Sequence, residues 1–208
     1  MRQRYFFSLF MLSVLLAGAA FSMPSVAQTP VAPIRVRGVI SAIEADTLVV
    51  STKDGSTVKV TLSVGVSIST VKAINISAIK PGSFIGTAAA PGADGGLQSL
   101  EVVVFPEEMR GTGEGHRDWD LTPGSSMTNA TVDAVVESAN GRNLQLSYKG
   151  GSLKISVPPS APIVTFVPAD RSDLKVGAPI FTSAIKAADG SLTVARVVVG
   201  KDGLAPPM

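Results

Sequence analysis

The stretch that decides the fold is Ile79-Lys80-Pro81-Gly82, continued by Asp94-Gly95-Gly96-Leu97 and Val102-Val103-Val104, because it occurs twice. The second occurrence, 95 positions later, is Leu174-Lys175-Val176-Gly177, Asp189-Gly190-Ser191-Leu192 and Val197-Val198-Val199. A fixed offset over so many positions indicates a duplicated structural unit. We therefore predict two copies of one small fold.

Each copy has the residue pattern of β-strands. Apolar and polar side chains alternate over residues 57–62 and again over 152–157. A period of two over six residues is typical of a half-buried strand. Gly in Lys53-Asp54-Gly55 and in its counterpart Lys149-Gly150-Gly151 supplies the backbone freedom that a tight hairpin turn needs. The predicted strands are 35–43, 47–52, 56–62, 67–73, 83–90 and 97–105 in the first copy, and 129–137, 143–148, 151–157, 163–168, 179–187 and 192–200 in the second.

One short element in each copy does not read as a strand. Segments 77–82 and 172–177 each predict a single helical turn with a Ser N-cap and a Gly after its end. Ile79 or Leu174 would then plug one end of a barrel. Copies this small favour closed barrels, because closure removes exposed strand edges. The predicted fold class is all-β, with two tandem small β-barrels of about six strands each.

The first 27 residues predict a secretory signal peptide. Arg2 and Arg4 form a basic start, residues 5–21 are mainly apolar, and Ser25-Val26-Ala27 offers small residues before a cleavage site at Gln28. The alternative is a retained membrane anchor, which the length of the apolar run disfavours because a span needs about 20 residues. We expect an exported, periplasmic protein.

The rest of the chain excludes several partner classes. Without Arg2 and Arg4, the 18 basic residues fall to 16, which equals the 16 acidic residues. A chain with balanced charge lacks the basic surface of a nucleic-acid-binding protein, so no nucleic-acid partner is expected. The chain has no Cys, so neither disulfides nor thiolate metal sites can form. Since no second long apolar run follows, we expect no stable membrane span after cleavage.

The predicted organisation has five parts. These are the signal peptide at 1–27, the first repeat at 33–105, an ordered Gly-rich and acidic linker at 106–128, the second repeat at 129–200, and a tail at 201–208 that is expected to fray.

The repeat, with its Leu-Lys-x-Gly turn, its Asp-Gly-x-Leu hairpin and its closing valine strand, resembles a bacterial family of exported small β-barrel domains. That family is catalogued as a domain of unknown function with an oligonucleotide/oligosaccharide-binding (OB)-like fold. The resemblance covers residues 33–105 and 129–200, with Ile79 in place of Leu. It implies tandem OB-like barrels and no activity. Some similar proteins are labelled metal transporter permease, a label this chain does not support because a permease needs several membrane spans.

The linker is the candidate functional segment. It holds the single His and the single Trp of the chain. The candidate ligand- or partner-binding residues are Glu114, His116, Arg117, Asp118, Trp119 and Asp120.

Three interpretations of this segment stay open. Trp119 could fill a gap between the barrels while the carboxylates cap turns or pair with Arg110 and Arg117. Trp119 could instead stack on a sugar or hold a cationic ligand. A divalent metal held by His116 and carboxylates is the third, although one His with scattered acids is a weak metal pattern.

Catalysis has little support in the sequence. There is no Cys nucleophile, no Gly-x-Ser-x-Gly motif, and His116 would have to serve any triad alone. We therefore expect no enzymatic activity, no cofactor and no dedicated metal site. The predicted function is a non-catalytic envelope module that binds a small molecule or an envelope protein. The alternatives are a purely structural or assembly protein, and a periplasmic metal-binding accessory that uses the linker around His116.

Overall fold

The computed structural model describes residues 32–138 and 141–207. The predicted signal peptide at 1–27 lies outside the described residues. Within them the chain is all-β, as predicted, with three short 3-10 turns and no α-helix. This described part contains no helix of the length and hydropathy that a membrane span requires.

The strand bounds follow the predicted alternation closely. The strands are β1 (Ile34–Glu44), β2 (Thr47–Thr52), β3 (Thr57–Ala73), β4 (Phe84–Pro91), β5 (Leu97–Val104), β6 (Gly115–Asp118), β7 (Ser126–Ser138), β8 (Gly141–Tyr148), β9 (Gly151–Val157), β10 (Ile163–Pro168), β11 (Pro179–Lys186) and β12 (Leu192–Val199). Two predicted strands at 56–62 and 67–73 form the single long strand β3, and β6 was not predicted.

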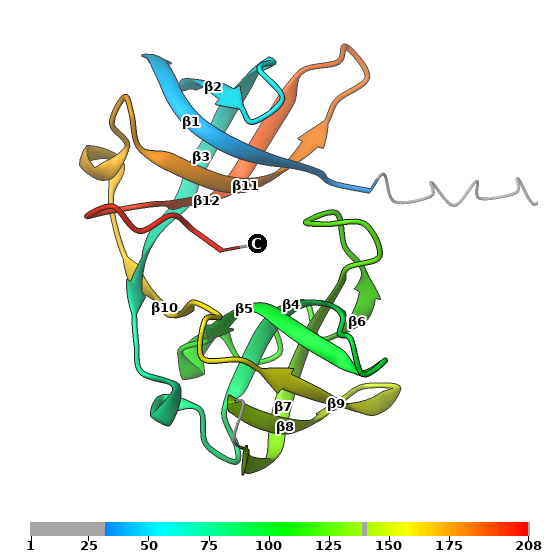
Figure 1. The fold of residues 1–208 in the computed structure, drawn as a ribbon. Helices are drawn as coiled ribbons and strands as arrows, with labels where there is room; N and C mark the ends of the chain where they lie inside the picture. Colours follow the sequence, from blue (N-terminus) through cyan, green and yellow to red (C-terminus); the bar gives the residue numbers. More distant parts are fainter. Residues whose placement is uncertain (1–31, 139–140, 208) are drawn as a thin grey trace, which may run out of the picture. The chain divides into compact units, whose positions relative to one another are not determined.

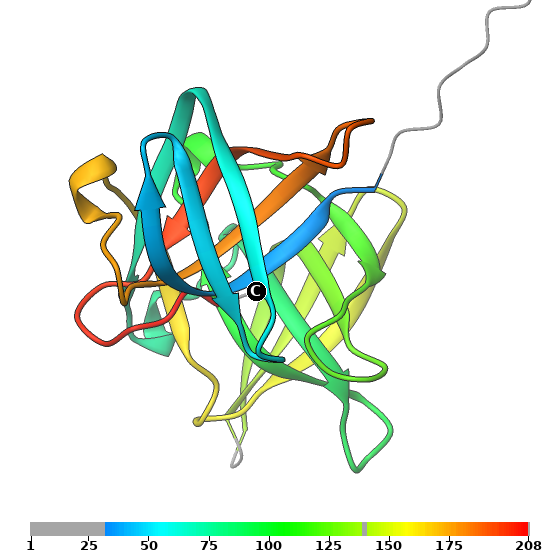
Figure 2. The ribbon, with the colours of Figure 1, turned by 90° about the horizontal axis from the view of Figure 1, so that it is seen from above.

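The first strands of the chain close a small β-barrel with the last ones (Figure 1). The strand order is β12-β11-β1-β2-β3, and β3 returns to pair with β12 in parallel. Ile34 lies opposite Ala184, which joins β1 to β11. Figure 2 shows the blue and cyan strands β1–β3 beside the orange and red strands β11 and β12. We call these five strands the first ring.

The strands in between form a second ring. Its order is β5-β4-β7-β8-β9, and β6 pairs with the first residues of β7. A short parallel pairing of β5 with β9 closes it, with Leu97 opposite Ile155 and Gln98 opposite Ser156.

This pairing differs from the predicted tandem arrangement, in which residues 33–105 and 129–200 would each close a barrel alone. The two copies instead exchange their last two strands. β4 and β5 of the first copy join the second ring, and β11 and β12 of the second copy join the first ring. The length of β3 explains the exchange: 17 residues extend about 55 Å, so the strand carries the chain out of one ring and toward the other.

The exchange is nearly symmetric. Where the chain crosses between the rings, β3 and β10 pair antiparallel, with Ser69 opposite Pro168 and Ala73 opposite Val164. At the centre Val71 lies opposite Phe166, which is its own counterpart 95 positions later. A two-fold relation between the copies therefore passes through this pair.

Three apolar cores support this arrangement. One lies within each ring, and the third joins strands of both rings and contains Phe84, Phe105, Phe166 and Phe181. The closing valine strands are buried on both faces, because Val197 and Val199 face the first-ring core while Val198 belongs to the third core.

The predicted plugs are confirmed, although each lies in the ring of the other copy. Leu174 is buried in the core of the first ring and Ile79 in that of the second. The preceding 3-10 turns, Ile76–Ala78 and Arg171–Asp173, are capped by Asn75 and Asp170, so the predicted Ser caps were wrong. Asn and Asp carry side-chain acceptors that cap as well as Ser does, and they stand two residues earlier in each copy.

The tail is docked rather than frayed over its described residues. Leu204 packs against the third core, and Lys201 bonds Asp173 through Nζ at 3.0 Å. Gly200 permits this path, since a Cβ there would lie 2.5 Å from Cγ of Pro179.

Candidate functional site

The linker is ordered, as predicted, and follows the second ring. After the 3-10 turn Glu107–Met109, β6 pairs antiparallel with the start of β7, and His116 lies opposite Thr128. Residues 126–128, assigned to the linker from sequence, form the beginning of β7. Successive residues of a strand face opposite sides, so β6 directs neighbouring candidate residues apart.

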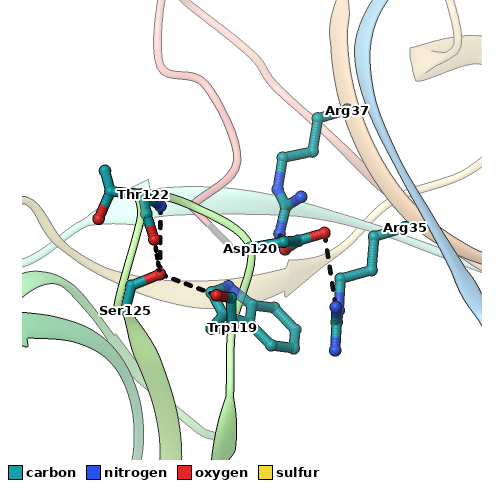
Figure 3. A network of polar contacts seen from close by, with 6 residues as sticks. All are labelled: Arg35, Arg37, Trp119, Asp120, Thr122 and Ser125. Atoms are coloured by element: carbon teal, nitrogen blue, oxygen red, sulfur yellow. Dashed lines mark hydrogen bonds and ion pairs between the residues drawn. The ribbon is translucent and has the colours of Figure 1, made fainter.

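A tight turn holds Trp119 in place (Figure 3). The Trp119 backbone N–H donates to the carbonyl of Ser125 at 2.8 Å, and the buried Ser125 hydroxyl lies 3.1 Å from the carbonyl of Trp119. That hydroxyl also donates to the Thr122 carbonyl at 2.7 Å. Gly124 has φ 72°, which the third position of a Pro-Gly turn requires. The turn thus presents Trp119 toward β1, away from its own strand.

Three guanidinium groups surround the half-buried ring of Trp119. The Arg35 guanidinium lies over the ring, 3.8 Å from its centroid, while those of Arg37 and Arg117 lie at 5.5 and 5.6 Å. Cations favour the face of an indole ring within about 6 Å. Because three guanidinium groups already lie within 6 Å of the ring centroid, a cationic ligand at this ring would meet like charges.

Asp120 is the acid that faces this cluster. Its carboxylate lies 2.9 Å from Nη2 of Arg37 and 3.4 Å from Nη1 of Arg35. Burial raises the pKa of Asp120, but the Arg37 hydrogen bond and the charges of Arg37 and Arg35 outweigh it, so the pKa lies below its ordinary value. These contacts tie the linker to β1 of the first ring (Figure 3).

The remaining candidate residues lie apart from Trp119. Glu114 accepts a hydrogen bond from the Lys149 backbone at 2.9 Å. His116 lies 2.8 Å through Nδ1 from the Thr128 hydroxyl and stacks on Tyr148 with 6.2 Å between ring centroids. Asp118 is exposed at the end of β6. The convergence that a metal site would need is not found, since no group of three His, Cys, Asp or Glu within residues 32–138 and 141–207 could hold an ion.

A cleft of about 430 Å³ opens beside Trp119, between strands of the two rings. It is lined by Ser67, Phe105, Thr112, Gly113, Arg117, Trp119, Asn129, Phe166, Phe181, Thr182, Ser183, Ile185, Ala195, Arg196 and Val198. Four aromatic rings therefore share one cleft, and the exposed Ile185 adds apolar surface. Of the six candidate residues, only Arg117 and Trp119 line this cleft.

Two lining residues have a buried polar atom without a hydrogen-bond partner in the described structure. These atoms are the donor Nε1 of Trp119 and the acceptor Oδ1 of Asn129. The Asn129 amide nitrogen donates to the Thr112 carbonyl at 2.8 Å, which fixes its side chain. A buried unpartnered polar atom costs about 1–3 kcal/mol. Both atoms therefore carry this cost in the described structure.

Arg117 is the half-buried cation of the cleft. Its Nη1 donates to the Gly113 carbonyl at 2.8 Å. Burial lowers the pKa of Arg117, and the positive charge of Arg35 lowers it further. The predicted pairing with a linker carboxylate is not found for Arg117 among the described residues. It is found for Arg110, whose Nη2 lies 2.7 Å from Oε2 of Glu107.

Most of the cleft was not predicted, although a signal was present in the repeats. Several lining residues stand where the two copies differ: Phe105 corresponds to Gly200, Phe166 to Val71, Phe181 to Gly86, and Arg196 to Glu101. Packing explains one of these differences, the Gly86 that corresponds to Phe181. A Cβ at Gly86 would lie 2.9 Å from the ring of Phe105. Positions at which a duplicated fold departs from its own symmetry could have indicated the site.

Comparison with family models, with curated proteins and with solved structures finds no match for this chain.

Proposed function

We propose that the chain is a non-catalytic binding module whose cleft beside Trp119 holds a small organic molecule with a flat apolar body. The observation that carries the proposal is the half-buried Trp119, which shares the cleft with three phenylalanine rings. Ligand sites are typically concave and mostly apolar, span about 300–1,000 Å³, and contain few polar groups. The cleft has these properties.

The proposal includes the two features that the residues and the resemblance predict together. The chain is an exported periplasmic protein, and its two repeats are diverged copies of one OB-like unit. The repeat offset and the matching positions of strands in both copies support common origin. The exchange of strands brings the two copies into one unit, and the ligand would lie where they meet.

The proposal is preferred over a purely structural role for one reason. A connector that only fills space would bury Trp119 and pair its polar atoms. Trp119 is half exposed instead, and its Nε1 lacks a partner within the described residues.

Native mass spectrometry of the chain purified from its own cell envelope tests the proposal. We expect a stoichiometric extra mass in the wild-type protein. Ala195→Trp places a bulky ring in the cleft and should abolish that mass, while Val176→Trp, at an exposed turn outside the cleft, should keep it.

Two results would overturn the proposal. An extra mass that survives Ala195→Trp would place the ligand elsewhere. A clean protein mass, together with no calorimetric binding of naphthalene-2-carboxylate or its amide, would leave the structural role.

A further inference from the structure

The charges around the cleft indicate the class of molecule that it binds. The lining contains two arginines, Arg117 and Arg196, and no Asp or Glu. Neither guanidinium forms an ion pair with an acid in the parts of the chain that the structure describes. The cleft therefore has an excess of positive charge, although the mature chain as a whole is balanced.

The surroundings of Arg117 disfavour its positive charge. Its guanidinium is partly withdrawn from water, and both burial and the nearby Arg35 lower its pKa. Among the described residues, its side chain donates one hydrogen bond, from Nη1 to the Gly113 carbonyl. A guanidinium carries five N–H donors in a planar fork that matches a carboxylate. Most donors of Arg117 thus remain for another acceptor.

The neighbouring acid cannot supply that acceptor. Asp120 is engaged by Arg37 and Arg35 on the side of β1 and does not line the cleft. It neutralises one charge in a cluster of three arginines around Trp119. A further anion would relieve the remaining repulsion and gain charge-assisted hydrogen bonds, which are stronger than neutral ones.

The aromatic part of the cleft sets the other requirement. Phe105, Phe166 and Phe181 belong to the third core, and the rings of Phe105 and Phe166 lie 5.6 Å apart between centroids. Flat rings gain from stacked or tilted aromatic neighbours beyond the area they bury. The cleft thus combines aromatic walls with guanidinium donors.

We infer that the cleft selects an anion with a flat apolar body, of the class of aromatic carboxylates. This inference rests on the proposed binding function and specifies its ligand. In the bound state, the ring of the ligand lies against the phenylalanines. Its carboxylate accepts hydrogen bonds from Arg117, and Arg196 contributes positive charge to the same cleft.

The test compares two probes of equal shape, naphthalene-2-carboxylate and naphthalene-2-carboxamide, by isothermal titration calorimetry on the whole chain. We expect the carboxylate to bind about tenfold more tightly, the scale of one charge-assisted hydrogen bond. Arg117→Gln should reduce this preference to less than threefold. Lys175→Gln removes an exposed charge outside the cleft and should leave it unchanged.

The single Trp of the chain provides an independent readout. Its one indole N–H signal in proton NMR should shift with the carboxylate more than with the amide. Spectra of each free variant confirm folding.

The outcomes separate the two proposals. If both probes bind equally, or if Arg117→Gln keeps the full preference, the anion inference is wrong while the binding function stands. If neither probe binds, the anion inference is wrong, and the binding function is wrong as well when native mass spectrometry shows no extra mass.

Discussion

Trp119 and His116 are three residues apart, yet their surroundings predict different contributions to the free energy of unfolding. The indole ring packs against the third core and beneath Arg35, whereas His116 is exposed and contacts Thr128 and Tyr148. Trp119→Ala should lower the free energy of unfolding by about 1–3 kcal/mol, less than a fully buried Trp would. His116→Ala should change it by less than about 0.5 kcal/mol. Urea unfolding followed by circular dichroism measures both.

The informative quantity is the difference in unfolding free energy between Trp119→Ala and His116→Ala. If His116→Ala proved the more destabilising, the docking of the linker through Trp119 would not be the contact that matters. Trp119→Phe serves as the matched control, because it keeps an aromatic ring in the same place.

Asp120 makes the docking of the linker sensitive to acid. Its pKa is lowered in the folded state, so its stabilisation is present above the unfolded-state value of about 3.9 and is lost as pH falls toward the folded pKa. Asp120→Asn removes this contribution, which is under about 1 kcal/mol because the pair is half exposed. The difference in unfolding free energy between wild type and variant should be constant above pH 5 and shrink below pH 4. A difference that stays constant down to pH 2 would contradict the assignment.

At the scale of elements, substitutions at the two plug residues, Leu174 and Ile79, test which ring core each 3-10 turn packs into. Leu174→Ala and Ile79→Ala should each cost about 2–4 kcal/mol, since both side chains are buried in a ring core. Amide hydrogen exchange distinguishes their locations. Leu174→Ala should speed exchange in β1 and β2, and Ile79→Ala in β7 and β8.

The exposed Val176, two residues after Leu174, provides the control, and Val176→Ala should leave exchange unchanged. If Leu174→Ala loosened β7 and β8 instead, each plug would serve the ring of its own copy and the exchanged pairing would be wrong.

Strands were predictable here because alternation is a local property, and turn residues mark their ends. The pairing partners were not, because they depend on contacts between residues far apart in the chain, such as Phe84 with Thr131 and Ile34 with Ala184. The predicted strands 56–62 and 67–73 left a gap that the structure does not have: Gly65, within that gap, adopts φ 73° in a strand that continues through it. In the second copy, Pro158, Pro159 and Pro162 do interrupt the equivalent strand.

The site was predictable only in part. Trp119 and Arg117 stood out because the linker departs from both repeats. Arg35, Arg37 and the phenylalanines did not, since each lies in a strand with an ordinary apolar or exposed pattern. Their grouping arises from the strand exchange, which brings β1, β10, β11 and β12 to the linker.

At the scale of the whole molecule, the exchange predicts how the chain responds to a cut. A protease site inserted after Glu108, in the exposed 3-10 turn of the linker, would divide the chain between the two copies. Both fragments contribute strands to both rings, so we expect them to co-elute in gel filtration after cleavage and to separate only in denaturant. Two independently closed barrels would separate into folded halves without denaturant.

Neither half should fold by itself. A fragment that ends at Glu108 contains β1–β5 but lacks the strands that complete either ring. Its circular dichroism and hydrogen exchange should show little protected structure until the other fragment is added. Recovery of protection at a one-to-one ratio would measure the association directly.

The strand exchange also determines the order in which the two rings can close. The second ring has all its strands once Val157 is present, whereas β1, β2 and β3 must wait for β12. In a chain exported with its N-terminus leading, the first segment to cross would be the last to find its partners. A product cut short before Pro179 would keep the edges of β1 and β3 unpaired, and such edges invite aggregation or proteolysis. Only molecules that include the final strand, β12, therefore have the edges of β1 and β3 paired.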